Sequence, residues 1–185
     1  MSAAPRAGRR VVAFTDHDGR SKFWTSTEAP AVVDFQSVPG LQASVLWATT
    51  GPITLERGIV PDPVPCLASL HPEPGGTTFM TVTIPPDSVY ESPDFDPEAA
   101  AAEQLRVLPG VADRMEPDAP GFHATDTVDY SLVLAGEIVL EVDGEEIGLT
   151  AGDTVIQLGA RHAWRNRSEG PATLAFILLG ARQSQ

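Results

Sequence analysis

Short apolar runs separated by turn dipeptides fill the second half of the chain. Asp143-Gly144 stands between two such runs and is the strongest hairpin signal in the sequence. Strands that recur every 8–12 residues or so are typical of a β-sandwich or barrel. The strand candidates in this half are residues 130–134, 138–142, 146–149, 154–158, 163–166 and 173–179.

The first half of the chain carries shorter strand-like pieces and one helical segment. Pro97, followed by acids and alanines, predicts a helix near residues 97–108, which is either a solvated connection or a lid over a pocket. We divide the chain into a flexible tail (1–9), an N-terminal β extension (10–62) and a β-barrel (63–182). The strand candidates here are residues 11–14, 31–35, 41–47 and 77–84.

The charge balance restricts the partners of the chain. It has 185 residues with 12 Lys and Arg against 25 Asp and Glu, a formal net charge of −13. Such a field repels phosphate backbones, so nucleic acid is not an expected partner. The apolar run 174–179 is far too short to cross a bilayer, no signal peptide is apparent, and the single cysteine permits no intrachain disulfide. We expect a cytoplasmic protein without membrane contact.

Two of the four histidines, His123 and His162, flank the series of strands. About three strands separate them, so a closed barrel can bring the two imidazoles face to face. If residues 123–129 are extended, alternation places Thr125 and Asp129 on the face of His123. Two imidazoles and one carboxylate suit Fe, Mn, Ni or Zn. The alternative is that both histidines cap strand ends by hydrogen bonding.

The other histidines and the cysteine are not predicted to carry chemistry. His71 lies in a proline-rich loop and is expected at the surface, and His17 is expected in a turn. Cys66 has no charged neighbour in sequence and is interpreted as an inert, buried thiol. No phosphate-binding glycine loop is present, so no nucleotide cofactor is expected.

Two spaced motifs occur between residues 118 and 180. The first is His123-x-Thr125, three residues, Asp129, six residues, Gly136. The second is Gly152-Asp153, followed by Gln157-x-Gly159-x-x-His162-x-x-x-Asn166. They resemble the cupin superfamily, whose first motif reads His-x-His, three or four residues, Glu, six residues, Gly. Its second reads Gly-Asp, then Pro-x-Gly-x-x-His-x-x-x-Asn.

The resemblance implies an all-β fold, a cupin-type double-stranded β-helix or jelly-roll barrel, here with extra N-terminal strands and one short helix. Carried over by position, the family's metal set becomes His123, Thr125, Asp129 and His162. A threonine hydroxyl is a weak ligand, and aspartate is one methylene shorter than glutamate. The resemblance therefore leaves two alternatives. Either His123, Asp129 and His162 bind a divalent metal, or they act directly as acid–base or hydrogen-bonding groups.

Three functions follow from this site. The first is an enzyme acting on a carbonyl, carboxylate or phenolic metabolite, a lyase or isomerase that uses either a metal or acid–base chemistry at His123, Asp129 and His162. The second is an Fe(II)-dependent dioxygenase on the same residues. The third is a non-catalytic small-molecule binder. The stretch 123–130 also resembles a cupin subgroup with members beside secondary-metabolite genes.

The barrel strands offer further residues for substrate binding. Inward-facing candidates beside Thr125 are Tyr130, Glu141, Gln157 and Trp164, although a register slip of one residue exchanges inward for outward. Trp164 is alternatively a core residue. Arg161, with two neighbouring arginines, either steers an anionic substrate or pairs with local acids.

The N-terminal extension exceeds what a minimal barrel needs. Cupins often pair by adding such strands to a neighbour's sheet, which also covers an exposed edge. The resemblance therefore favours a homodimer. The alternative is that residues 10–62 extend the sheet of their own subunit.

Overall fold

The computed structural model describes residues 9–25 and 32–183, which form two antiparallel sheets and a separate hairpin. The tail expected over residues 1–9 lies, apart from residue 9, outside this described part. The strands are β1 (Val11–Thr15), β2 (Ser21–Thr25), β3 (Val32–Asp34), β4 (Gln42–Thr49), β5 (Thr77–Ile84), β6 (Thr127–Ala135), β7 (Glu137–Val142), β8 (Glu145–Thr150), β9 (Thr154–Leu158), β10 (Ala163–Arg165) and β11 (Ala172–Gly180). The helices are α1 (Pro97–Val107) and the 3-10 turns η1 (Val64–Cys66), η2 (Asp87–Val89) and η3 (Ala112–Arg114).

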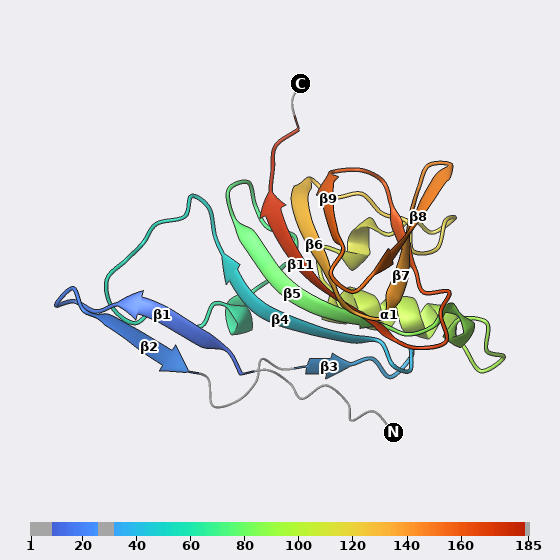
Figure 1. Cartoon of the computed structure of the whole chain (residues 1–185), viewed down its shortest axis with the longest axis horizontal. Coiled ribbons are helices and arrows are strands. Elements are labelled where there is room, and N and C mark those ends of the chain that lie inside the picture. The colour runs from blue at the N-terminus through green and yellow to red at the C-terminus, as the bar shows by residue number, and fades with distance from the viewer. Residues whose placement is uncertain (1–8, 26–31, 184–185) are drawn as a thin grey trace.

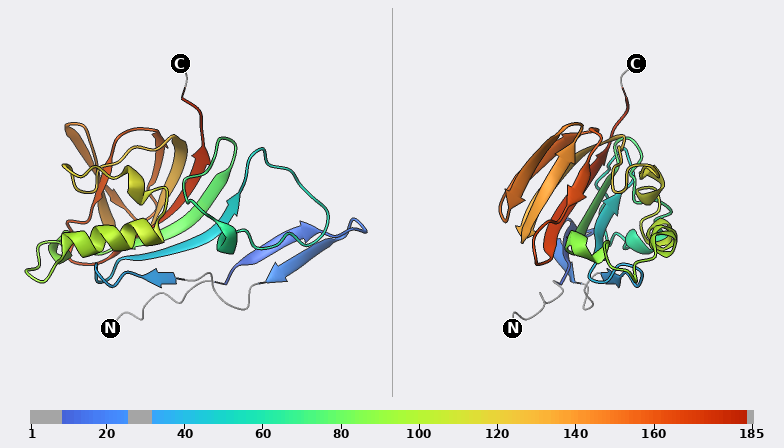
Figure 2. Two further views of the ribbon diagram at one scale, coloured as in Figure 1. Left: turned by 180° about the vertical axis from the view of Figure 1, so that it is seen from behind. Right: turned by 90° about the vertical axis from the view of Figure 1, so that its right-hand side faces the viewer.

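The larger sheet has six strands in the order β3-β4-β5-β11-β6-β9, and the smaller has three in the order β10-β7-β8. In Figure 1, α1 lies behind β4 and β5, and the view from behind in Figure 2 shows it in front of them. The expectation of an all-β jelly roll with one short helix is confirmed. The turn at Asp143-Gly144 joins β7 to β8, as predicted, with Gly144 at a φ of 78° that favours glycine.

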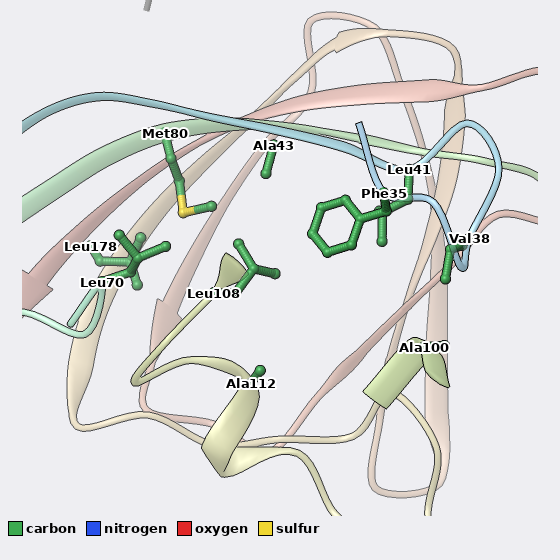
Figure 3. Packing of buried hydrophobic residues seen from close by; sticks show 10 residues of the cluster. All are labelled: Phe35, Val38, Leu41, Ala43, Leu70, Met80, Ala100, Leu108, Ala112 and Leu178. Atoms are coloured by element: carbon green, nitrogen blue, oxygen red, sulfur yellow. The ribbon is translucent and has the colours of Figure 1, made fainter. Parts of the chain in front are cut away.

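One face of the larger sheet is buried by two different layers. Towards β4, the inward side chains of Ala43, Met80 and Leu178 pack with Leu108 and Ala112, which follow α1 (Figure 3). Towards β6, a second cluster joins both sheets. Its buried members are Val133, Ile138, Leu140, Leu149, Ala172 and Leu174. The two clusters explain why most inward residues of β5 and β11 are apolar, whereas β6 contributes only Val133 to them and turns Thr127, Asp129 and Ser131 inward.

Helix α1 is held at its start and along one face. Asp96 accepts hydrogen bonds from the backbone N–H groups of Glu98 and Ala99, both at 3.0 Å, which is N-cap geometry. The buried Glu103 carboxylate accepts from the backbone N–H of Gln36 at 3.0 Å and of Ser37 at 2.7 Å. The helix is thus a packed layer of the fold, tied to the segment before β4.

The N-terminal extension contributes directly to the larger sheet. Strand β4 pairs with β5, and β3 pairs with β4, so this part of the chain extends the sheet of its own subunit. The β1–β2 hairpin instead projects away from the two sheets (Figure 1). Strand β2 was not predicted, because it begins with the polar pair Ser21-Lys22. Cys66 is exposed, which corrects the expectation of a buried thiol.

Asn166, which ends the second motif, ties β10 to the end of β5. Its side-chain amide donates to the carbonyls of Ile84 and Gly170, each at 2.9 Å, and its Oδ1 accepts from Ser168 N at 3.1 Å and Oγ at 2.7 Å. The residue is fully buried. We expect Asn166→Ala to lower the free energy of unfolding by about 2 kcal/mol, because it leaves buried backbone groups without partners. Urea unfolding measures this loss, and an unchanged midpoint would contradict it.

Candidate functional site

The fold brings His123 and His162 into contact. Each backbone N–H donates to the other residue's carbonyl oxygen at 3.0 Å, an isolated antiparallel bridge between the segment before β6 and the segment before β10. The two imidazole ring centroids lie 4.3 Å apart. Two residues that are 39 positions apart in the sequence thus form one pair, and the four strands β6 to β9 lie between them in the chain.

Each imidazole of this pair has a fixed orientation. His123 Nδ1 lies 3.1 Å from the carbonyl oxygen of Gly121, and His162 Nδ1 lies 2.8 Å from that of Ala160. A carbonyl oxygen only accepts, so Nδ1 carries the proton in both rings. In the neutral imidazole, Nε2 then has a free lone pair. Both rings therefore present a base at Nε2.

Asp129 and Gln157 lie opposite each other on β6 and β9, facing the interior. The Asp129 side chain is 93% buried, since only 7% of the residue is exposed, and its Oδ1 has no hydrogen-bond partner among the described residues. Gln157 is also buried, and its Nε2 likewise lacks a partner there, while its Oε1 accepts from Ser131 at 3.4 Å. Thr125, which precedes β6, is also buried, and its Oγ1 lies 2.7 Å from Thr127 Oγ1.

These unpartnered atoms carry a physical cost. A buried donor or acceptor without a partner destabilises a fold by about 1–3 kcal/mol. Proteins usually satisfy such groups with ordered water or a ligand. A donor at Gln157 and an acceptor at Asp129 lie on facing strands, and Asp129 interacts electrostatically with His123, so together they form a polar interior that suits a small polar molecule.

His71 belongs with this group, although the sequence placed it in a surface loop. It is half-buried, and its Nε2 is buried without a partner in the described chain. Burial lowers the pKa of His71, and the carboxylate of Asp129 opposes this shift. The His71 imidazole in turn lowers the pKa of Asp129, against the effect of burial. The loop after it reaches this place because Gly75 N–H donates to Gly180 O at 2.9 Å, at the end of β11. No local signal in the sequence predicts that contact.

Burial shifts the pKa values of these groups in opposite directions. It raises the pKa of Asp129 above its usual value, partly opposed by a hydrogen bond from Thr127 and by His123. It lowers the pKa of His123 and lowers that of His162 to about 4, where the neighbouring His123 adds to the effect. Near neutral pH both imidazoles are therefore uncharged bases, beside a carboxyl group that holds its proton more tightly than usual.

Some predicted residues lie elsewhere. Tyr130 is 45% exposed on the outer face of β6, opposite to Asp129, which corrects the expectation that it lines the site. Glu141 is paired with Arg165 at 2.8 Å. Trp164 lies edge-on to His162, with ring centroids 6.2 Å apart, and also packs on Phe176 in the second core cluster. It is thus both a core residue and a neighbour of the pair.

Arg161 is held by acids rather than free for a substrate. Its guanidinium bonds both oxygens of Glu116 at 2.7 Å and Asp143 at 2.6 Å, and it stacks 3.9 Å above the ring of Phe122. The two neighbouring arginines are paired in the same way, Arg165 with Glu141 and Arg167 with Glu146. This arrangement agrees with the alternative in which the basic cluster neutralises local acids.

The residues do not fit the predicted three-ligand metal site. Among residues 9–25 and 32–183, no three His, Cys, Asp or Glu side chains are placed to hold one ion. His123 and His162 supply two nitrogen donors, and Thr125 stands where the resemblance expects a third imidazole. We therefore derive no step through a metal.

Two cavities lie away from the histidine pair. One of about 690 Å³ lies between β1 and the strands β4 and β5, and one of about 350 Å³ lies beside the start of α1. Neither is lined by His123, Asp129 or His162. The candidate site is thus separate from both of these cavities.

A two-sheet jelly roll that holds a pair of histidines is characteristic of one class of proteins. Comparison with known proteins identifies that class. The family model for the cupin domain matches residues 114–178. Phomopsin biosynthesis cluster protein C' of Diaporthe leptostromiformis is 31% identical over 173 residues, 91% of this chain and 77% of that protein. Oryzines biosynthesis cluster protein J of Aspergillus oryzae is 43% identical over 65 residues, 34% of this chain and 36% of that protein. The chain belongs to the cupin superfamily.

Solved structures give weaker similarities. The cupin domain of Schizosaccharomyces pombe Cnp3 aligns with a TM-score of 0.48 and 11% identity, covering 93% of this chain and 87% of that one. A Cupin 2 conserved barrel domain protein from Salinispora arenicola aligns with a TM-score of 0.41 and 14% identity, over 83% and 92% of the two chains. In the described residues, the structure has no helix with the length and hydropathy needed to span a membrane.

Proposed function

We propose that this cupin is a secondary-metabolism enzyme that moves protons on a small carbonyl, carboxylate or phenolic metabolite, as a lyase or isomerase. The observation that supports it most is the pair of unpartnered buried atoms on facing strands, Asp129 Oδ1 and Gln157 Nε2, together with two oriented imidazoles, of which His123 interacts electrostatically with Asp129. Relatives that are named for biosynthesis clusters support the metabolic setting. The substrate is expected to bind between the sheets.

The proposed reaction begins with proton abstraction. Nε2 of His123 or His162 takes a proton from the carbon next to the substrate carbonyl, and the C–H electron pair becomes the double bond of an enol. The Asp129 carboxyl, whose pKa burial raises, is the group that gives a proton to the carbonyl oxygen, and Gln157 Nε2 donates a hydrogen bond to the same oxygen. Return of the proton from the imidazolium to another carbon, with the enol O–H proton going back to Asp129, gives an isomer. In a 3-oxo acid no C–H proton is abstracted: the bond to the carboxylate breaks, carbon dioxide leaves, and the electron pair of that bond becomes the double bond of the enol as Asp129 protonates the carbonyl oxygen, which is a lyase reaction.

Hydrogen exchange in D₂O tests this proposal without knowledge of the product. A panel of 2-oxo acids, 1,3-dicarbonyl compounds and phenols is incubated with the protein, and C–H to C–D exchange is followed by NMR. We expect exchange for at least one class, and its loss in His162→Ala. A compound that binds by calorimetry but never exchanges would favour the non-catalytic binder and overturn the proposal.

Metal analysis gives a second prediction. Because no three His, Cys, Asp or Glu side chains of the described residues are placed to hold one ion, we expect no stoichiometric metal in protein purified without chelator, and the same exchange rate after dialysis against EDTA. Elemental analysis and the exchange assay measure both. One equivalent of Fe, Mn, Ni or Zn, with exchange lost on its removal, would replace acid–base chemistry by metal-assisted chemistry at the same residues.

A further inference from the structure

One arginine near the candidate site differs from the three that acids neutralise. Arg161, Arg165 and Arg167 each hydrogen-bond a carboxylate at 2.9 Å or less. Arg114, in η3, lies 3.8 Å from the carboxylate of Asp126, which is too far for a hydrogen bond. Among the described residues its only hydrogen bond is made by Nε, so Nη1 and Nη2 have none there. This guanidinium therefore keeps two donors for a ligand.

Arg114 lies against the loop that carries His71, and Gly110 joins the two. The Nε of Arg114 donates to the carbonyl oxygen of Gly110 at 3.2 Å. Gly110 has a φ of 83°, and a Cβ there would overlap the Ser69 hydroxyl and lie 3.2 Å from the backbone nitrogen of His71. Glycine at this position therefore allows the close approach of the two segments.

The residues next to this arginine and this histidine in the chain connect them to the candidate site. Met115 forms an isolated antiparallel bridge with His123. Leu70 packs in the same core cluster as Leu178 (Figure 3), and Leu178 lies opposite Asp129 in the pairing of β11 with β6. These two segments therefore border the interior that contains Asp129 and His123.

Exposure to solvent falls from Arg114 through His71 to Asp129. The Arg114 side chain is 36% exposed, His71 is half-buried, and Asp129 is 7% exposed. The Nε2 atom of His71 is buried and has no hydrogen-bond partner within the described chain. Two donors at the rim and one at this intermediate depth suit the anionic group of a molecule that extends inward to Asp129.

Acids around His71 favour the form in which its Nε2 donates. Burial and then Arg114 lower the pKa of His71, whereas Asp126, Asp129 and Glu73 raise it. These carboxylates therefore stabilise the protonated ring nitrogen. None of them hydrogen-bonds Nε2, so an anion from outside the chain can accept that bond.

We propose that Arg114 and His71 form an anion-binding subsite for the carboxylate of the substrate, whose carbonyl lies at Asp129 and Gln157. Nη1 and Nη2 of the planar guanidinium donate to the two carboxylate oxygens, and the Nε2–H of His71 donates to one of them. This inference rests on the proposed function and narrows its substrate class to oxo acids, which carry both groups in one molecule. In a chain of net charge −13, the anion that was expected at Arg161 is thus assigned to a different arginine.

Calorimetry of the full chain tests the subsite with pyruvate, acetoacetate and levulinate, which have none, one and two CH₂ groups between carbonyl and carboxylate. Each acid is compared with its methyl ester, which keeps the carbonyl and removes the charge. We expect at least one acid to bind at least about 10-fold more tightly than its ester, because hydrogen bonds between charged groups are the strong ones. Arg114→Gln and His71→Gln should each reduce this preference to about 3-fold or less, and Arg114→Lys, which keeps the charge but not the planar pair of donors, should give an intermediate value.

Arg106→Gln is the matched control, because it removes the same charge from α1, where the side chain is 71% exposed. We expect it to keep the native preference. Equal loss in this variant, or no acid that the native chain binds more tightly than its ester, would overturn the subsite. If His71→Gln does not fold, as judged by circular dichroism, Arg114→Gln at its exposed position decides. Exchange in D₂O separates this inference from the proposed function: exchange with no acid preference contradicts the subsite alone, whereas an acid preference with no exchange contradicts the enzyme and leaves the subsite in place.

Discussion

Replacing Asp129 by asparagine is expected to slow substrate hydrogen exchange by about 10²–10⁴-fold, the usual contribution of a positioned proton donor or acceptor. The amide has nearly the shape of the carboxyl group and fits the same buried position opposite Gln157. It has no proton to give to a carbonyl oxygen. The exchange rate in D₂O at neutral pH, measured on the substrate class that the native chain accepts, gives the result.

The same substitution is expected to make the fold more stable at neutral pH. Burial raises the pKa of Asp129 in the folded chain, so ionisation of this group opposes folding. Stability from this group is complete below its unfolded pKa and declines as pH rises towards the raised folded pKa. Asparagine does not ionise, so Asp129→Asn should exceed the native chain in urea midpoint at pH 7 and match it near pH 3.

Opposite changes in activity and stability separate a functional acid from a structural one. A purely structural Asp129 would lose stability on substitution and leave exchange unchanged. The matched control is Asp126→Asn, three residues away, whose side chain is 40% exposed and lies 3.8 Å from Arg114. We expect that variant to exchange at the native rate. Equal slowing in both variants would remove Asp129 from its proposed role.

Local patterns in the sequence were sufficient for most of the barrel. The predicted strands 77–84 and 154–158 agree with β5 and β9 residue for residue, because a β-rich run ends at Pro85 and a turn precedes Thr154. Alternation along β6 correctly placed Asp129 on the interior face, and Thr125, which precedes β6, is also buried. These features depend on interactions between residues a few positions apart, so the local sequence is enough to predict them.

Long-range contacts account for what the sequence did not predict. His71 reaches Asp129 through the contact of its loop with Gly180, more than 100 residues later. Arg161 is neutralised by Glu116, which lies 45 residues before it. Tyr130 was expected inside although it is adjacent to Asp129 and so must face the other way in a regular strand. That error came from the sequence interpretation itself.

Acid is expected to destabilise the chain through His162, with an effect of about 3 kcal/mol. The residue is 3% exposed, and burial beside His123 lowers its pKa from 6.5 to about 4. A histidine with a lowered folded pKa contributes its full stability above the unfolded pKa of 6.5, and this contribution is lost as pH falls towards 4. Between these pH values the unfolded chain binds a proton at His162, whereas the buried ring of the folded chain stays uncharged.

The difference between the native chain and His162→Gln isolates this contribution, because the other acids and histidines titrate in both. We expect native stability to fall by about 3 kcal/mol more than that of the variant between pH 7 and pH 4.5, as measured by urea unfolding. His17→Gln, which removes an exposed imidazole from the turn after β1, is the matched control. Parallel pH profiles for the native chain and His162→Gln would show that His162 is protonated as readily in the folded chain as in the unfolded chain. In that case His162 would keep its ordinary pKa, and burial would not be what holds its imidazole uncharged near neutral pH.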